Sequence, residues 1–290
     1  MFSAPLFAIK SARPSLRHHQ RVVIKIGSNV IASQSEGLHE ERVRNLATSI
    51  AALRFEGREL FIVSSGAILC GREALHRSAN KSASPLVSDN LMSSDLSIKQ
   101  AAAAVGQSRL MWIYEKCFAE FGITVAQILL TREDIDHPKR LANAQGTLLT
   151  LLRYGVLPII NENDTVAVDE IRMGDNDYLA GLVATRLVAA TLLILLSDVD
   201  GLYTADPRTE PTATLLTEVS AMTPEIEAMA KGTRDSGGTG GMISKIHTAK
   251  QAMNDGIATL ILNGGNPDFL QHAFQDHPVG TLFVPPSQTA

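Results

Sequence analysis

The sequence predicts an α/β fold in which a parallel sheet is covered by helices on both faces. Two observations predict it. Strand-like and helix-like stretches alternate along the 290 residues, which is typical of chains that build parallel sheets. The strand-like stretches, such as "RVVIKI" and "ATLLILL", are apolar at consecutive positions, as expected of strands buried on both sides. No linker divides the chain, so we expect one domain over residues 21–290.

The individual elements follow from periodicity and from their end signals. A first strand is expected over 21–26. A helix is expected over 39–57, because Val43, Leu46, Ile50 and Leu53 share one face and Gly57 can end it. A second helix, closed by Gly155, is expected over 141–155. The further strands are expected over 59–65, 123–130, 156–161, 190–198 and 257–265. The Ser-rich stretch 76–97 is interpreted as a surface insertion between helices, and 197–208 as tight turns around a short hairpin.

Composition excludes several classes of function. The net charge of −4 argues against bulk nucleic-acid binding, which needs a basic surface. The longest apolar run, Leu187–Leu196 with one Thr inside, is too short to span a bilayer. Cys70 and Cys117 are interpreted as buried thiols, and no Cys/His cluster has the spacing of a zinc site. We therefore expect no membrane partner, no nucleic-acid partner and no metal held by the protein itself.

The first twenty residues differ from the rest. No acidic residue precedes Glu36, whereas Lys10, Arg13 and Arg17 lie in this stretch. We interpret residues 1–20 as a flexible leader, with a mitochondrial transit peptide as the alternative. The expected location is accordingly the cytoplasm, or the mitochondrion on the alternative interpretation.

Small, polar or charged residues stand at the ends of four predicted strands. Ligands of open α/β sheets bind beyond the carboxyl ends of the strands, so these ends are where a site is expected. Core packing alone would not ask for such residues at four separate places. The four ends are Lys25-Ile26-Gly27-Ser28, Ser64-Ser65-Gly66, Asn161-Glu162-Asn163-Asp164 and Ser197-Asp198.

Two of the polar segments suit phosphate. Lys25 interrupts an apolar strand, and Gly27 would let a ligand approach the backbone closely. The segment "SGGTGGMISKIHTAKQA" (236–252) leads from glycines into a helix, whose N-terminus offers bare N–H groups to anions. Lys245 falls near the first turn of that helix. A cation there interacts unfavourably with the helix dipole, and a bound anion would offset that cost. The alternative is a flexible loop followed by a surface lysine.

A cluster of carboxylates and amides suits an amine-bearing substrate or the positioning of lysines. Asn161, Glu162, Asn163 and Asp164 end one strand, and Asp175, Asn176 and Asp177 open a helix. One residue before a helix is routinely an N-cap, which explains one of the last three and leaves two. The turns after Ser197 and Asp198 would suit an adenine or ribose pocket, although that motif alone does not show one.

Together these segments resemble the amino-acid kinase family, and within it the members that phosphorylate glutamate. The resemblance runs from about Arg21 to Phe283. The Asn-Glu-Asn-Asp and Gly-Asp-Asn-Asp pair is specific to the glutamate-using members, whereas the lysines and glycine loops are shared more widely. The matching text is "VVIKIGSNV", "IVSSGAI", "QAAAAVGQSRLM", "ILLTREDI", "LPIINENDTVAVDEIRMGDND", "DVDGLYTADPR" and "GTGGMISKIHTAKQA".

The resemblance implies a three-layer αβα sandwich around a mostly parallel sheet of about eight strands. It implies transfer of the γ-phosphoryl group of ATP, carried with Mg²⁺, to the side-chain carboxylate of L-glutamate. The product would be glutamyl 5-phosphate, in the first step of proline biosynthesis. It also implies a homo-oligomer (dimer or tetramer) and feedback inhibition by proline.

The same resemblance assigns roles to residues. Lys25, Lys245 and Asp177 would be catalytic, with the lysines offsetting charge on the transferring group and Asp177 orienting them. Ser65, Gly66, Asp164 and Asn176 would bind glutamate. The nucleotide would be held by Lys25, Gly27, Ser197, Asp198, Thr239, Gly240, Gly241, Met242, Ile243, Ser244 and Lys245.

The chain departs from many relatives in two ways. Ser64 stands where many have Thr, which retains the hydroxyl. Many bacterial relatives carry a C-terminal domain of the type called PUA, and none is expected here because the chain stops at Ala290. Two alternatives stay open: another small-molecule kinase of the family, acting on acetylglutamate or uridylate, or a non-catalytic amino-acid sensor on the same fold.

Overall fold

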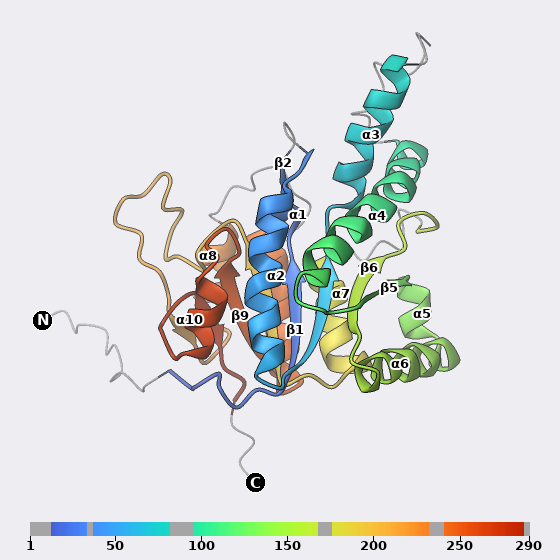
Figure 1. The fold of residues 1–290 in the computed structure, drawn as a ribbon. Coiled ribbons are helices and arrows are strands. Elements are labelled where there is room, and N and C mark those ends of the chain that lie inside the picture. Colours follow the sequence, from blue (N-terminus) through green and yellow to red (C-terminus); the bar gives the residue numbers. More distant parts are fainter. Residues whose placement is uncertain (1–12, 34–36, 82–94, 168–175, 232–240, 287–290) are drawn as a thin grey trace, which may run out of the picture.

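The computed structural model of the chain describes residues 13–33, 37–81, 95–167, 176–231 and 241–286. Within these ranges the fold centres on an eight-stranded sheet with the order β5-β6-β4-β1-β7-β9-β10-β8 (Figure 1). Its strands are β1 (Arg21–Ile26), β4 (Glu59–Ser64), β5 (Val125–Leu130), β6 (Leu157–Glu162), β7 (Leu192–Ser197), β8 (Glu218–Val219), β9 (Ala258–Asn263) and β10 (Thr281–Phe283). A separate small ribbon pairs β2 (Ala32–Ser33) with β3 (Gly37–Leu38).

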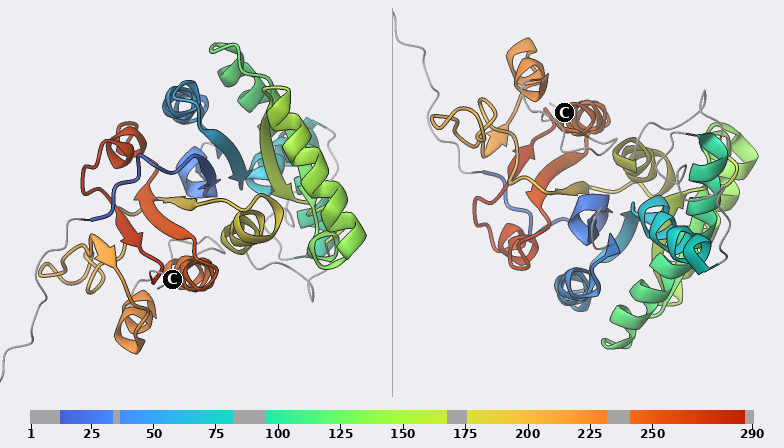
Figure 2. Two further views of the ribbon diagram at one scale, coloured as in Figure 1. Left: turned by 90° about the horizontal axis from the view of Figure 1, so that it is seen from below. Right: turned by 90° about the horizontal axis from the view of Figure 1, so that it is seen from above.

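Helices cover both faces of the sheet, as the two end-on views in Figure 2 show. One apolar cluster joins the sheet to α2, α4 and α10, and a second joins the other face to α6, α7 and α9. The helices are α1 (Ser28–Ile31), α2 (Glu40–Phe55), α3 (Ala67–Lys81), α4 (Leu96–Ala119), α5 (Arg132–Asp136), α6 (Pro138–Arg153), α7 (Asn176–Leu182), α8 (Pro224–Lys231), α9 (Met242–Asn254) and α10 (Phe269–Phe274), with a π-helical turn η2 (Val183–Leu187) after α7. The predicted three-layer α/β architecture is confirmed.

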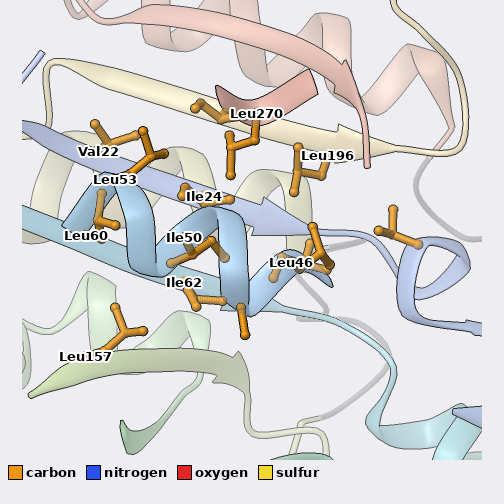
Figure 3. Close-up of a cluster of buried hydrophobic side chains, with 14 of the residues drawn as sticks. Val22, Ile24, Leu46, Ile50, Leu53, Leu60, Ile62, Leu157, Leu196 and Leu270 are labelled. Carbon is orange, nitrogen blue, oxygen red and sulfur yellow. The ribbon is translucent and has the colours of Figure 1, made fainter. Parts of the chain in front are cut away.

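The apolar face predicted for α2 is the face that packs on the sheet. Leu46, Ile50 and Leu53 of α2 point toward Val22 and Ile24 of β1, and all five are buried (Figure 3). Burying a side chain of this size contributes about 1.5–3 kcal/mol relative to leaving it exposed. The 3.6-residue period of the sequence therefore reports the real interface.

The chain order of the strands places the site. β1 lies between β4 and β7 and pairs parallel with both. The first half of the chain continues from β4 to one side, and β7 begins the strands on the other side. Such a reversal is the topological switch point at which open α/β sheets bind ligands, beyond the carboxyl ends of the strands. The ends of β1, β4, β6 and β7 are the four strand ends that the sequence singles out.

The predicted strands and helices are confirmed, and their ends differ by a few residues. The largest shift is at α6, which begins at Pro138 instead of Leu141, because proline is well suited to the first position of a helix. Parallel pairing dominates as predicted. Within the described part of the eight-stranded sheet one pairing is antiparallel, β9 with β10, and the small β2–β3 ribbon is antiparallel as well. The elements absent from the predictions are short: β2, β3, β8, β10, α1, α5, α8 and α10.

The structure differs from the predictions in two segments, the Ser-rich stretch 76–97 and the expected leader 1–20. In the Ser-rich stretch 76–97, α3 continues to Lys81 and α4 begins at Leu96, and residues 82–94 lie outside the described residues. In the expected leader, Leu16 is buried and Arg13 Nη1 donates a hydrogen bond to Val279 O, so packing begins before residue 21. Residues 1–12 lie outside the described ranges.

Two further predictions concern the cysteines and the membrane. Cys70 and Cys117 are both buried free thiols, and burial raises the pKa of Cys70 to about 11. This confirms the interpretation of both as buried thiols. Among the helices that the structure describes, none has the length and apolar character needed to cross a bilayer.

Candidate active site

Lys25 is buried because of the alternation of β1. Successive side chains of a strand point to opposite faces, so Lys25 lies on the same face as Val23, toward α7 and α9. Only 3% of the surface of Lys25 is exposed. The Nζ atom reaches Asp177 Oδ1 at 2.6 Å, with both side chains enclosed. The lysine that interrupts an apolar strand is therefore part of a buried ion pair.

Asp177 joins the two predicted lysines. It lies in the first turn of α7, is 0% exposed, and accepts a 3.0 Å hydrogen bond from Lys245 Nζ through Oδ2. Burial by itself would raise the pKa of Asp177, but the charges of Lys25 and Lys245 outweigh it and hold the pKa below its usual value. Asp177 is therefore a carboxylate that holds two ammonium groups side by side.

Together the three groups carry a net positive charge in a buried place. Desolvated charge of one sign is costly, and an anion that enters the site would offset it. The arrangement therefore favours a strongly anionic ligand, such as a phosphoryl group, beside Lys25 and Lys245.

The depressed pKa of Asp177 predicts how stability depends on pH. A carboxylate whose pKa is lower folded than unfolded stabilises the fold fully above its ordinary pKa, about 3.9, and loses this contribution as pH falls. We expect the difference in unfolding free energy between the wild type and Asp177→Asn to be steady near neutral pH and to shrink below about pH 4. Urea unfolding at a series of pH values measures it, and a difference that widens in acid would contradict the assignment.

The glycine-rich segment ends at a helix N-terminus, as predicted. Gly241 is the N-cap of α9, and Lys245 lies in the first turn with 4% of its surface exposed. Thr239 and Gly240 lie outside the described residues. Across the site, a Cβ atom on Gly27 would lie 3.2 Å from Leu196 O and 3.9 Å from Lys25 Nζ. Gly27 therefore keeps the backbone open next to the Lys25 ammonium.

The residues predicted to bind glutamate lie around Asn176 and the end of β4. Asn176, its neighbour, donates through Nδ2 to Ser64 O at 2.9 Å and to Ser65 Oγ at 3.0 Å. Gly66 follows with φ at +105°, a conformation that favours glycine, and α3 begins at the next residue. Asp164 lies half-buried in the turn after β6. Ser65, Gly66 and Asn176 are thus brought together, next to the lysine pair.

Three polar residues in this region are missing from the predicted site. Asn161 Oδ1 accepts a 2.8 Å hydrogen bond from Asn176 Nδ2, and Asn161 Nδ2 donates to Gln107 Oε1 at 2.9 Å. Tyr114 Oη lies 2.8 Å from Ser64 Oγ. Gln107 and Tyr114 come from α4, which carries no glycine-rich or acidic motif. The sequence gave two signals: Asn161 stands at a strand end, and Gln107 lies within the family-like segment "QAAAAVGQSRLM", which assigned it no role.

Ser197 and Asp198 lie at the end of β7. Ser197 Oγ donates to Asp198 Oδ1 at 3.2 Å, and Asn29 Nδ2 of α1 donates to Asp198 Oδ2 at 3.1 Å. The turns that follow belong to a longer hairpin than predicted, in which Tyr203 and Leu215 form an antiparallel bridge. These residues flank the end of β1 from the side opposite Ser65.

Comparison with known proteins agrees with this geometry. Residues 20–263 match the model of the amino acid kinase family. The chain is 49% identical over 266 residues to a protein named glutamate 5-kinase of Geobacter sulfurreducens, covering 92% of this chain and 68% of that protein. It is 47% identical to another of that name from Burkholderia thailandensis, covering 94% and 70% of the two chains.

Solved structures share the fold at low sequence identity. A carbamate kinase from Giardia lamblia bound to AMP-PNP superposes with a TM-score of 0.64 at 17% identity, covering 93% of this chain and 99% of that one. A UMP kinase from Ureaplasma parvum superposes with a TM-score of 0.61 at 14% identity, covering 92% and 99%. At these identities the likeness establishes the fold alone.

Proposed function

The chain belongs to the amino acid kinase family, and on that basis we propose that it transfers the γ-phosphoryl group of ATP to the side-chain carboxylate of L-glutamate. The products are glutamyl 5-phosphate and ADP, in the first step of proline biosynthesis. The observation that carries the proposal is the buried Lys25–Asp177–Lys245 group beside Asn176 and Ser65. It combines a cationic site for the transferring phosphoryl group with an adjacent polar site for an amino acid.

Catalysis rests on positioning and charge. A glutamate carboxylate oxygen attacks the γ-phosphorus, the bond to the oxygen bridging the β- and γ-phosphates breaks, and ADP leaves with that electron pair. No covalent protein group is needed for such a transfer. Lys25 and Lys245 would stabilise the negative charge of the transferring group, and Asp177 would hold their ammonium groups in place.

The nucleotide would lie over the ends of β1 and β7 and the start of α9. Gly27 leaves room for phosphate oxygens beside Lys25. Backbone N–H groups from Gly241 to Ser244 would bind phosphate, because the start of a helix leaves them without partners inside the helix, whereas the Lys245 N–H already bonds Gly241 O. Ser197 and Asp198 would contact the sugar or base.

Mg²⁺ would reach the site on the phosphates of ATP. This ion usually keeps several waters and binds through substrate phosphates, where it neutralises charge. In the described ranges no group of three or more acidic, His or Cys side chains is placed to hold a metal ion, and Asp177 already pairs with two lysines. We therefore assign no protein ligand to it.

Release of ADP with three acceptors tests the proposal against the alternatives. The purified protein is expected to release ADP with L-glutamate and not with N-acetylglutamate or UMP. Preference for either of the latter would indicate another kinase of the family. No release with any of the three, together with glutamate binding, would indicate a sensor. The two lysines favour the kinase, because a sensor has no need to stabilise a transferring charge.

Asp164 and Asn176 are expected to act on glutamate and not on ATP. Losing one hydrogen bond to a charged group costs about 1.5–3 kcal/mol, so Asp164→Ala and Asn176→Ala should each raise KM for glutamate by roughly ten- to a hundredfold. KM for ATP should stay nearly unchanged. Initial rates with each substrate varied in turn measure this. Equal effects on both KM values would show that these residues shape the site as a whole.

Proline is expected to inhibit the reaction. It shares the α-carboxylate and a cationic amine with glutamate and lacks the carboxylate that accepts phosphate. A pocket of Ser65, Asp164 and Asn176 could bind the shared part. Residues 166–175, proposed to rearrange between the two forms, fall largely outside the described ranges. Glutamate saturation curves at several proline concentrations measure this, and curves that superimpose up to millimolar proline would contradict it.

The shape of those curves also bears on assembly. We propose a homo-oligomer, dimer or tetramer. Sigmoidicity that grows with proline is expected of linked subunits, whereas a parallel rightward shift is expected of simple competition. Light scattering on the eluting protein gives the mass of the assembly directly. The expected cytoplasmic location stays a prediction.

A further inference from the structure

Side-chain amides form a continuous hydrogen-bonded row behind the candidate glutamate site. Gln107 Nε2 of α4 donates to Gln127 Oε1 at 3.2 Å, and Asn161 Nδ2 of β6 donates to Gln107 Oε1 at 2.9 Å. Asn176 Nδ2 of α7 donates to Asn161 Oδ1 at 2.8 Å. The row runs from the exposed Gln127 through the buried Gln107 and Asn161 to the half-buried Asn176. We call these four residues the amide row.

The backbone fixes the direction of every amide in the row. The N–H group of Glu162, which can only donate, bonds Asn161 Oδ1 at 2.9 Å. Asn161 must therefore donate to Gln107 through Nδ2, and Gln107 must accept this hydrogen bond with Oε1. At the other end Ser64 O, which can only accept, receives Asn176 Nδ2. Turning any buried amide over would set two donors or two acceptors against each other, at a cost of about 1–3 kcal/mol for each unsatisfied group.

This direction decides what Asn176 and Ser65 can offer a ligand. All hydrogen bonds found for the Asn176 side chain in the described part of the chain use Nδ2, so Oδ1 remains as an acceptor. Nδ2 has two hydrogens for three acceptors, so one hydrogen is shared between two of them. An amide nitrogen does not accept, so the Ser65 hydroxyl proton points away from Asn176 and remains to be donated. One acceptor and one donor side by side match the ammonium and carboxylate groups on a single α-carbon.

Helix α4 supports this arrangement from behind at two points. A Cβ atom on Gly106, next to Gln107, would lie only 1.7 Å from Ala67 O, so the backbones of α4 and α3 touch. Tyr114 of the same helix meets Ser64 Oγ at 2.8 Å, and Ser64 Oγ donates to Ser65 O at 3.0 Å. The Tyr114 hydroxyl must then donate to Ser64. The orientation of the strand end is thereby tied to α4.

We propose that Gln107 is a positioning residue: through Asn161 it holds Asn176 Oδ1 toward the α-ammonium group of the substrate and leaves the Ser65 hydroxyl for the α-carboxylate. Gln107 itself touches no substrate. The inference rests on the proposed reaction, with glutamate as acceptor, and adds which atom of the site reads which end of the amino acid.

The test replaces Gln107 in two ways and compares both KM values. Gln107→Met keeps the length of the side chain and removes its acceptor, so KM for glutamate is expected to rise about tenfold, with KM for ATP within about twofold. Gln107→Glu keeps an acceptor for Asn161 Nδ2, and the exposed Gln127 can turn to donate to it. We expect KM for glutamate within about threefold of the wild type in that variant. Gln251→Met, on the exposed face of α9, is the matched control.

A second arm tests the assignment of atoms. Glutarate lacks the α-ammonium group but keeps the carboxylate that Ser65 would bind, so in Gln107→Met its inhibition constant against glutamate should worsen clearly less than KM for glutamate does. A constant that worsens as much as KM for glutamate would overturn the assignment of Asn176 Oδ1.

The outcomes separate the positioning role from the proposed function. An unchanged KM for glutamate in Gln107→Met, or equal rises for glutamate and ATP, would overturn the positioning role. If Gln107→Met does not fold, a raised KM for glutamate in Gln107→Glu would overturn it. A wild type that releases no ADP with glutamate would contradict the proposed function instead.

Discussion

Replacing Asp177 by asparagine is expected to lower kcat at least a hundredfold and to destabilise the fold. Asp177 is fully buried and is the shared partner of two enclosed lysines. Removing one partner of a buried ion pair leaves charge uncompensated and typically costs about 3–5 kcal/mol. Asparagine has nearly the same shape, so the change isolates the charge. Urea unfolding gives the stability, and steady-state rates give kcat.

Asp136→Asn is the matched control for that experiment. Asp136 is also a carboxylate with two cationic partners, Arg132 and Arg186, but its side chain is 53% exposed. Exposed pairs are typically worth less than about 1 kcal/mol, so this variant should keep its stability and its kcat. If Asp177→Asn behaved like the control, Asp177 would not be holding the lysines in a working position.

Lys245→Ala is expected to lower kcat by roughly a hundred- to a thousandfold, the scale seen when one preorganised charge-stabilising donor is removed. Its effect on KM for glutamate should be far smaller, because the charge is needed where negative charge moves in the transition state. Lys25→Ala should behave similarly, since both ammonium groups meet the same carboxylate.

Lys250→Ala, in the same helix, controls for the loss of a lysine from α9. Its ammonium pairs with Glu227 at the surface, with 47% of the side chain exposed. Rates should stay near those of the wild type. A Lys245→Ala variant with near-normal kcat would remove Lys245 from the catalytic set.

Much of the fold and the lysine pair could be predicted from local conflicts in the sequence. An apolar strand has no reason to contain Lys25, and a helix N-terminus has no reason to carry Lys245 unless an anion is near. An N-cap requires one polar residue before the helix, and Asp177 stands in addition to those already available for it. Each of these residues contradicts its local setting, and each is buried in the same contact. Such conflicts are visible in one chain because they do not depend on knowing the partner.

The amide row could not be predicted in the same way. Gln107 and Tyr114 are ordinary residues of a long helix, and their partners Asn161 and Ser64 lie far away in the chain. Nothing local is strained or unpaired until the tertiary contacts form. The same holds for β8 and β10, which are two and three residues long and are defined by pairing with their neighbours. The helix α5 does have a local signal in the sequence, the capping box formed by Thr131 and Asp134. A search for hydrophobic periodicity does not detect this signal.

The central claim is that phosphate goes to the side-chain carboxylate of glutamate, and trapping the product tests it most directly. Hydroxylamine attacks the carbonyl of an acyl phosphate and displaces phosphate, which leaves a stable hydroxamate at the carboxylate that was phosphorylated. With ATP, L-glutamate and hydroxylamine, the protein is expected to form glutamate γ-hydroxamate in step with ADP release. Release of ADP without γ-hydroxamate, or with the hydroxamate on the α-carboxylate, would contradict the account.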